Sequence, residues 1–126
     1  MMIKSIFPLF IGSIKKMFNL KGRSGKKEYI TFTFFEFLIF TPYAILFKYY
    51  SKNPSTINVI LLIAFFILIF IYIISYYSLT VRRLHDCGLS GWWYILNFIF
   101  SPFIFLILCF IKGDKNKNKY GAPPEE

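Results

Sequence analysis

The run from Ile57 to Leu79 constrains this chain more than any other feature, because its 23 residues include no charged side chain. As an α-helix rising about 1.5 Å per residue, the run would extend roughly 34 Å and cross the ~30 Å hydrocarbon core of a bilayer. A soluble domain of 126 residues, 56% hydrophobic and 22% aromatic, has too small a core to bury that much apolar surface. The sequence therefore predicts one membrane domain and no soluble catalytic domain.

Two further apolar stretches accompany this run, one over about 29–47 and one over about 92–111. We predict an all-α integral membrane protein with an amphipathic N-terminal helix and three main apolar helical segments. The predicted organisation is an interfacial helix within 1–21, a membrane domain over 22–111 with spans near 29–47, 57–79 and 92–111, and a polar tail over 112–126. The Lys, Asn and Pro content of that tail predicts loose order.

Residues 3–18 place apolar side chains at helical spacing, with lysines and serines elsewhere on the helix. The apolar set is Ile3, Ile6, Phe7, Phe10, Ile14, Met17 and Phe18. This pattern predicts a basic amphipathic helix that lies in the plane of the membrane interface. A helix that packs against protein through the same face is the alternative.

The basic residues are unevenly distributed along a chain whose net charge is +9. Seven of them precede the first span, namely Lys4, Lys15, Lys16, Lys21, Arg23, Lys26 and Lys27. By the positive-inside rule this excess places the N-terminus in the cytoplasm. Because the charges flank apolar spans and no nucleic-acid-binding module is recognisable, we expect membrane lipids with anionic headgroups as partners, and no nucleic acid.

The third apolar stretch permits two readings. A continuous helix over 92–111 has the usual spanning length and would export the tail with Lys112, Lys115, Lys117 and Lys119. A break at Ser101-Pro102 would instead give a helical hairpin and return the tail. Basic residues would then number 13 inside and 2 outside, against 9 and 6 for the continuous helix. Charge favours the hairpin, whereas length favours the continuous helix, which we expect.

A polar hinge over 80–91 separates the second and third stretches. If the second helix continues past the membrane, Asp86 lies one turn from Arg82 and Arg83, within pairing reach. On the same side of the membrane, Glu28 at the start of the first span suits the positive end of that helix dipole. Glu28 could also pair with an arginine of the hinge.

The rest of the hinge carries signals for helix ends. Gly88 can adopt the left-handed conformation that ends a helix, and Ser90 can cap the next one. Trp92 and Trp93 then open the third stretch, where their rings suit the headgroup level of a bilayer.

Three motifs together resemble a known family. They are Gly22-Arg23 with Lys26-x-Glu28-Tyr29; Arg82-Arg83-Leu84-His85-Asp86 with Ser90-Gly91-Trp92-Trp93; and Asn118-x-Tyr120-Gly121-x-x-Pro124. They look like the motifs of the bacterial inner-membrane family called domain of unknown function 805, over about residues 15–124. The resemblance implies a cytoplasmic (inner) membrane location and a multi-pass architecture, and it implies no reaction. Lys26 stands where the family usually has Arg, and Lys cannot make a bidentate fork.

The charged residues of these motifs have two readings. In the structural one, Arg82 and Arg83 fix the helix end and Asp86 satisfies them. In the other, Arg23, Lys26, Lys27, Arg82 and Arg83 bind an anionic group, such as a lipid phosphate or the acidic segment of a partner. The leading function is a non-enzymatic scaffold or accessory subunit that presents this basic cluster to anionic lipid or a partner. A homo-oligomer is plausible because bulky apolar faces would meet lipid or a second copy.

Two other function classes stay open. Glu36 is costly inside a membrane and could serve a small transporter or channel, or could bond Ser75, Asn97 or Ser101 on a neighbouring helix.

His85 and Asp86 could instead serve a membrane enzyme acting on a lipid phosphate, although no nucleophile or phosphate loop accompanies them. His85, Asp86 and Cys87 are consecutive and point in different directions, so we expect no metal site and no cofactor. Cys87 and Cys109 are expected to be free thiols.

Overall fold

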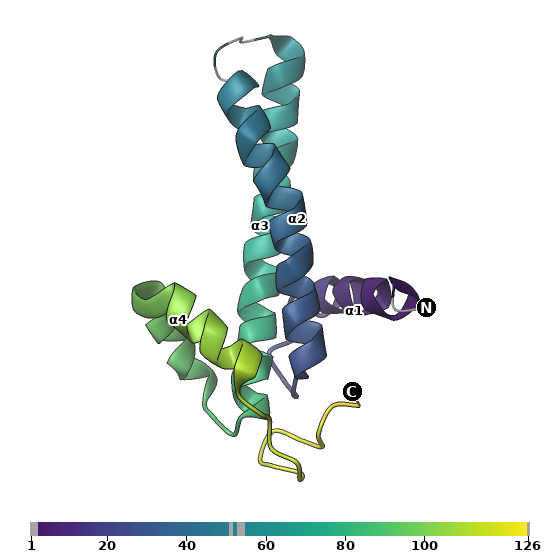
Figure 1. The fold of residues 1–126 in the computed structure, drawn as a ribbon, viewed down its shortest axis with the longest axis vertical. Helices are drawn as coiled ribbons and strands as arrows, with labels where there is room; N and C mark the ends of the chain where they lie inside the picture. Colours follow the sequence, from purple (N-terminus) through teal and green to yellow (C-terminus); the bar gives the residue numbers. More distant parts are fainter. Residues whose placement is uncertain (1–2, 51, 53–54, 126) are drawn as a thin grey trace.

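The computed structural model of the chain describes residues 3–50, 52 and 55–125, without the side chains of 3–5, 49–50 and 101–102 (Figure 1). Its elements are α1 (Ile3–Lys15), α2 (Lys26–Tyr50), α3 (Thr56–Asp86), the 3-10 helix η1 (Gly91–Ile95) and α4 (Leu96–Phe110). Within the described residues the only β-type pairing is one isolated bridge between Asn118 and Gly121. The all-α prediction is confirmed.

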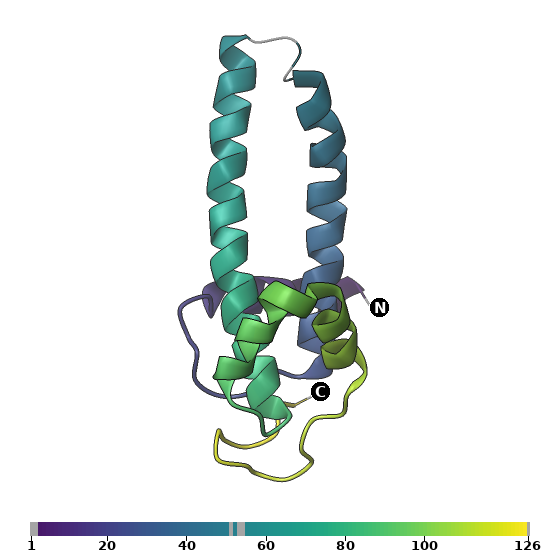
Figure 2. The same ribbon diagram turned by 90° about the vertical axis from the view of Figure 1, so that its left-hand side faces the viewer.

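Helices α2 and α3 run side by side as a long antiparallel hairpin (Figures 1 and 2). With 25 and 31 residues they extend roughly 37 and 46 Å, more than a bilayer core requires. In the most apolar 18-residue stretch of each helix only 6% is buried, so neither is the core helix of a soluble protein. These are transmembrane helices, and they contain the predicted spans 29–47 and 57–79.

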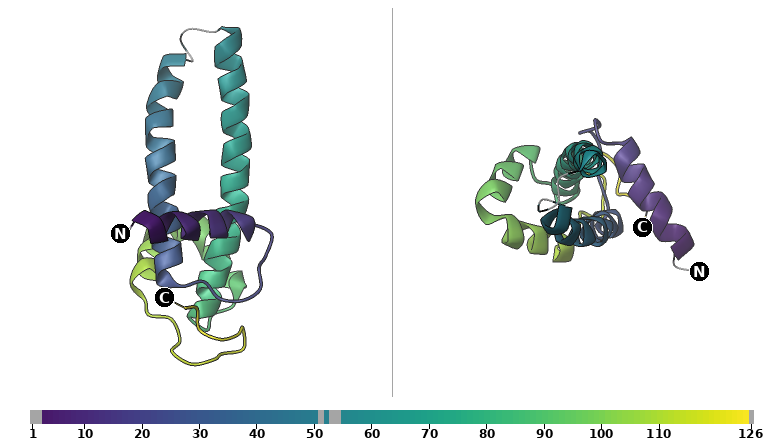
Figure 3. Two further views of the ribbon diagram at one scale, coloured as in Figure 1. Left: turned by 90° about the vertical axis from the view of Figure 1, so that its right-hand side faces the viewer. Right: turned by 90° about the horizontal axis from the view of Figure 1, so that it is seen from above.

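Helix α1 lies across the hairpin, near the end where α2 begins and α3 finishes (Figure 3). We call this end the base and the opposite end, near residues 50–56, the distal end. The Phe10 ring packs 5.5 Å from Phe32 and 4.8 Å from Phe35, so the apolar face of α1 contacts α2. This packing matches the alternative prediction of a helix that packs against protein, while the position of α1 in the membrane interface stays a prediction. Regular α-helix stops at Lys15, earlier than predicted.

The expected continuous span over 92–111 is wrong. Instead η1 leads into α4, which bends at Phe100 (φ −122°, ψ 33°). Pro102 explains the bend, because proline has no N–H to donate to the carbonyl four residues earlier in a helix. Figures 1 and 2 show α4 curling beside the base without following α2 and α3 to the distal end. This shape matches the hairpin alternative.

The tail returns to the base, and its predicted loose order is also wrong. Arg23 donates to the Asn116 carbonyl at 2.9 Å, and Asn118 Nδ2 donates to the His85 carbonyl at 2.9 Å. Each of these bonds joins residues far apart in the sequence, so folding of the rest of the chain supplies the order that composition alone does not.

A small apolar core joins α2, α3 and α4 at the base. Its buried members are Tyr29, Phe32, Leu79, Leu84, Leu108 and Cys109. Aromatic pairs extend this core toward the distal end, because Phe32 stacks on Tyr72 with ring centroids 5.8 Å apart and Tyr72 in turn contacts Phe40, one ring edge-on to the other, at 5.1 Å. The core holds the ends of the three helices in register, and that register positions the charged residues described next.

Candidate functional site

Five charged residues gather at the base, and we call them the base cluster: Arg23, Glu28, Arg82, Arg83 and Asp86. Arg23 comes from the linker before α2, Glu28 from the first turn of α2, and the other three from the last turns of α3. The cluster forms because α3 continues about two turns beyond the apolar run that ends at Leu79.

Asp86 is the centre of the cluster. Its Oδ1 atom accepts from Arg23 Nε at 2.9 Å and lies 2.8 Å from Arg23 Nη2, while its Oδ2 atom accepts from Arg83 Nη1. The three side chains are at most 4% exposed. The predicted pairing of Asp86 with Arg83 is confirmed, since a helix brings residues three apart onto one face. Asp86 binds Arg23 as its second arginine, in place of the expected Arg82.

Arg83 holds the end of α4. Its Nε atom donates to the Leu108 carbonyl at 3.1 Å, and its Nη2 atom donates to the Ile111 carbonyl at 2.6 Å. Carbonyls at a helix C-terminus have no partner inside the helix and carry partial negative charge. A guanidinium therefore satisfies them well, and Arg83 fixes α4 against α3.

Arg23 holds the tail in the same way. Its Nη1 atom donates to the carbonyls of Asn116 at 2.9 Å and Gly121 at 3.3 Å, and its Nη2 atom donates to the Asp114 carbonyl. Such a spread of bonds uses the rigid, multi-donor shape of a guanidinium. Because their donors are directed at this chain itself, Arg23 and Arg83 fit the structural reading.

Glu28 and Arg82 form the second pair of the cluster. The Glu28 carboxylate accepts from Ser13 Oγ at 2.9 Å, Ser24 Oγ at 2.7 Å and Arg82 Nη1 at 3.4 Å. The prediction that Glu28 pairs with an arginine of the hinge is confirmed. Ser13 belongs to α1, so Glu28 connects α1, α2 and α3. The Nε and Nη2 atoms of Arg82 are buried and have no hydrogen-bond partner among the described residues.

The tail motif also joins the site, around His85. The His85 ring stacks on Tyr120 with centroids 3.8 Å apart, and its Nδ1 atom lies 3.2 Å from the Gly22 carbonyl. Asn118 Nδ2 donates to the His85 carbonyl and, at 2.8 Å, to Asp114 Oδ2, while the Gly121 carbonyl receives Arg23. All three sequence motifs therefore meet at the base.

The predicted helix-end residues behave as expected. Gly88 has φ +73° just after α3, and the Ser90 side chain accepts from the Trp92 backbone N–H at 3.5 Å. Trp92 and Trp93 are 80% and 52% exposed. Trp rings exposed beside transmembrane helices suit a membrane interface.

Sequence reasoning missed the first residues of the tail. A Cβ atom at Gly113 would lie 2.0 Å from Asp86 Oδ2, so only glycine lets the backbone pass this close to the carboxylate. The next residue, Asp114, donates its N–H to the Asp86 carbonyl at 2.8 Å. The Gly-Asp pair was visible as a turn signal, but nothing local indicates that the turn lies on Asp86.

Lysines border the cluster. Lys26 is half-buried with Nζ 5.7 Å from the Phe110 ring centroid, and it lines a pocket of about 260 Å³ together with Lys112 and Lys115. Lys27 is exposed. The lysines therefore surround the base, whereas the arginines lie inside it.

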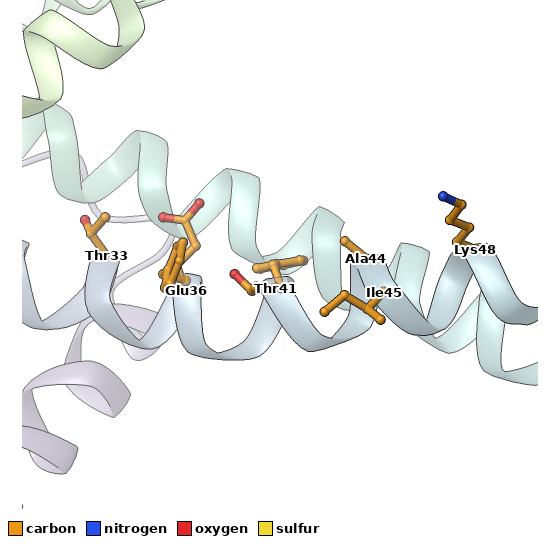
Figure 4. A pocket seen from close by; sticks show the side chains of 8 residues that line it. Thr33, Glu36, Thr41, Ala44, Ile45 and Lys48 are labelled. Carbon is orange, nitrogen blue, oxygen red and sulfur yellow. The ribbon is translucent and has the colours of Figure 1, made fainter.

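Glu36 lies outside the base cluster, half-buried on α2. It lines an open groove of about 770 Å³ in which Thr33, Glu36 and Lys48 project from the same side of α2 (Figure 4). Its polar neighbour across the helix pair is Tyr72 of α3. Of the expected partners, Ser75 donates to the Ile71 carbonyl at 2.9 Å instead. The side chain of Ser101 is outside the described part of the chain.

The described residues contain no group of three or more His, Cys, Asp or Glu side chains arranged to hold a metal ion. Cys87 and Cys109 are both free thiols, as predicted. Cys87 is half-buried behind the base cluster, and this burial raises the pKa of its thiol, an effect that the nearby Arg83 charge opposes.

Comparison with known proteins places these motifs in a family. The family described as "Protein of unknown function (DUF805)" matches residues 17–122. Inner membrane protein YhaI of Escherichia coli (strain K12) is 26% identical over 120 residues, which cover 92% of this chain and 94% of YhaI. Inner membrane protein YhaH of the same strain is also 26% identical, with 92% of this chain and 95% of YhaH covered. No solved structure matches the chain.

The matched range begins before Arg23 and ends after Gly121, so it includes the five residues of the base cluster together with His85, Asn118 and Tyr120. This agreement confirms the resemblance inferred from the three motifs. The chain is a membrane protein with transmembrane helices, and it belongs to the DUF805 family, whose function is unknown.

Proposed function

We propose that this chain is a small non-enzymatic scaffold or accessory subunit of the bacterial inner membrane, whose base contacts anionic lipid headgroups or an acidic partner. The inner-membrane location is supported by the similarity to YhaI and YhaH, which are both named inner membrane proteins. The rest of the proposal depends on how charge is distributed over the fold.

One observation carries the proposal: of 15 Lys and Arg residues, only Lys48 and Lys52 lie toward the distal end, which leaves 13 in segments at the base. Eight of those 13 are exposed lysines: Lys15, Lys16, Lys21, Lys27, Lys112, Lys115, Lys117 and Lys119. Such a ring of lysines suits a cytoplasmic leaflet rich in anionic lipid. In this orientation both terminal segments are cytoplasmic.

The surroundings of His85 and Asp86 support a non-enzymatic role. Asp86 lines the pocket beside Lys112, whereas His85 lines a different pocket beside Trp92. Both carboxylate oxygens of Asp86 are bound by arginines. An acid–base pair has to face one substrate, and these two side chains face separate spaces.

Glu36 has a structural role in this proposal. The groove that Glu36 lines contains the polar side chains of Thr33 and Thr41, but the rings of Phe37 and Phe40 lie among them. These aromatic side chains interrupt any polar path along α2. The contact with Tyr72 gives the carboxyl group a partner on the neighbouring helix. Unchanged proton flux through proteoliposomes of Glu36→Gln would agree with this role, and loss of a wild-type flux would favour the transporter alternative.

The test compares lysines at the two ends of the hairpin. We expect the double variant Lys115→Gln, Lys117→Gln to lose roughly tenfold of the preference of the full chain for phosphatidylglycerol over phosphatidylcholine. Native mass spectrometry in detergent with both lipids present measures this preference. The matched control is Lys48→Gln, Lys52→Gln, which should retain it. Equal loss in both double variants, or loss in neither, would contradict the proposal.

A further inference from the structure

A second pocket at the base lies away from the base cluster, between the end of α3, η1, the start of α4 and the tail. Its volume is about 470 Å³, and it is rich in aromatic side chains, among them Tyr77, Trp92, Tyr94, Phe98 and Tyr120. We call it the aromatic pocket. Neither the proposed function nor the motifs assign it a ligand.

The pocket changes character along α3. Tyr77, Val81 and His85 line it at four-residue intervals, so they form one stripe about 12 Å long on that helix. The end of the pocket near Tyr77, which is the end closer to the distal end of the hairpin, is apolar. There the Tyr77 ring lies edge-to-face against Tyr94 with ring centroids 4.7 Å apart, and Phe98 is 82% exposed. Because exposed apolar side chains beside transmembrane helices face lipid, we expect this end of the pocket to face lipid.

The other end of the pocket, near His85, is polar. Because the Gly22 carbonyl can only accept, the 3.2 Å contact requires the proton on His85 Nδ1 and leaves Nε2 with a free lone pair. A Cβ atom at Gly91 would lie 3.4 Å from that Nε2 atom and 2.9 Å from Val81 Cγ1, so glycine keeps this space open. The Ser90 hydroxyl accepts from Trp92 and still has its own proton to donate.

The charge at this end is positive. Lys119 Nζ lies 4.9 Å from the centroid of the ring of Tyr120, which lines the pocket, while Lys119 itself is not one of the lining residues. No Asp or Glu is among the described residues that line the pocket. A ligand that fits must therefore be elongated and lie along α3. It must be apolar where it meets Tyr77 and must carry an anionic group or a hydroxyl where it meets His85.

We infer that the aromatic pocket binds one anionic phospholipid, with an acyl chain along Tyr77 and Phe98 and the headgroup at His85, Ser90 and Lys119. The order of apolar and polar surface follows the order of acyl chain and phosphate along a membrane-spanning helix, and the exposed Trp92 suits headgroup depth. This inference rests on the proposed function, since it gives the basic base one defined lipid site.

The experiment uses Trp92, which lines the pocket, and Trp93, which does not. In Trp93→Phe the remaining tryptophan reports on the pocket. The full chain is placed in phosphatidylcholine vesicles that contain a small fraction of either brominated phosphatidylglycerol or brominated phosphatidylcholine. We expect at least twofold stronger quenching by the brominated phosphatidylglycerol. The matched variant Trp92→Phe should show a smaller difference between the two lipids.

Two lysine variants complete the test in the Trp93→Phe background. Lys119→Gln removes the cation next to the Tyr120 ring and should abolish the difference between the lipids, whereas Lys117→Gln, at an exposed position two residues away, should retain it. Equal quenching by both lipids without any lysine change would overturn the inference. So would loss of the difference when excess glycerol phosphate is added, because the site would then bind a soluble anion.

This test and the test of the proposed function can fail separately. Specific quenching that depends on Lys119, together with no effect of Lys115→Gln, Lys117→Gln on lipid preference, would keep the aromatic pocket and refute the general basic surface. The reverse result would keep the surface and refute the pocket.

Discussion

The base and the distal half of the hairpin differ in which side chains they bury and which they expose. At the base, Arg82, Arg83 and Asp86 are at most 3% exposed, while at mid-hairpin Phe66 and Phe70 are 62% and 65% exposed. Polar residues inside and apolar residues outside are the reverse of a soluble fold, and lipid accounts for the outer surface. This difference indicates that the surrounding lipid determines the structure of the distal half. The structure of the base is determined by specific bonds between residues that are far apart in the sequence.

The first way to break the comparison is Asp86→Ala, which has the largest expected effect. The change leaves Arg23 and Arg83 buried without their shared carboxylate, and we expect about 3–5 kcal/mol of lost stability. Equilibrium unfolding in mixed micelles measures it. The exposed Glu125→Ala is the control and should stay near wild type. A loss below about 1 kcal/mol in Asp86→Ala would mean that the base cluster is not what holds the base.

Arg23→Lys comes next, and it separates charge from shape. Lysine keeps the attraction to Asp86 but cannot also donate to the carbonyls of Asn116 and Gly121. We expect a loss of about 2 kcal/mol and faster proteolysis of the tail. Lys21→Arg, at an exposed position of the same linker, serves as the matched control. Wild-type protection of the tail in Arg23→Lys would show that charge alone suffices.

Gly88→Ala tests the turn that follows α3. A side chain at φ +73° costs about 1–2 kcal/mol, and the new Cβ atom would meet Asp114 Oδ2 at 2.9 Å. The same unfolding measurement should show a loss of this size. Gly12→Ala is the comparison, because its Cβ atom meets nothing within 4 Å. An unchanged stability in Gly88→Ala would mean that the turn relaxes freely.

The smallest effect is expected in the distal half, and it sharpens the contrast. Phe66→Leu exchanges one lipid-facing apolar side chain for another, and the free energy of unfolding should change by less than about 0.5 kcal/mol. Phe32→Leu, which is 1% exposed in the core at the base, should cost more under the same conditions. Equal losses in both variants would show that the distal half is packed as specifically as the base.

The sequence predicts the parts of this fold that depend on local spacing. The two transmembrane helices follow from the length of their apolar runs, and the Arg83–Asp86 pair follows from helical periodicity. Gly88 and Ser90 are recognisable as helix-end residues from their type and position. Each of these predictions needs only a few neighbouring residues.

The remaining features depend on backbone atoms far away in the chain. Arg83 binds the carbonyls of Leu108 and Ile111, and Arg23 binds those of the tail. Every residue has a carbonyl, so no residue type marks these acceptors in advance. For the same reason the length of the apolar stretch over 92–111 predicts a continuous span, although α4 bends and the tail returns to the base. The 13-to-2 distribution of basic residues favours this return.

The most direct test of the account is the side of the membrane on which each end of the chain emerges. Single cysteines are placed by Lys21→Cys, Lys52→Cys or Lys119→Cys in a background of Cys87→Ser and Cys109→Ser, and an impermeant maleimide is applied to sealed vesicles of known orientation. The account predicts that positions 21 and 119 are labelled from one face and position 52 from the other. Labelling of 119 from the same face as 52 would contradict it.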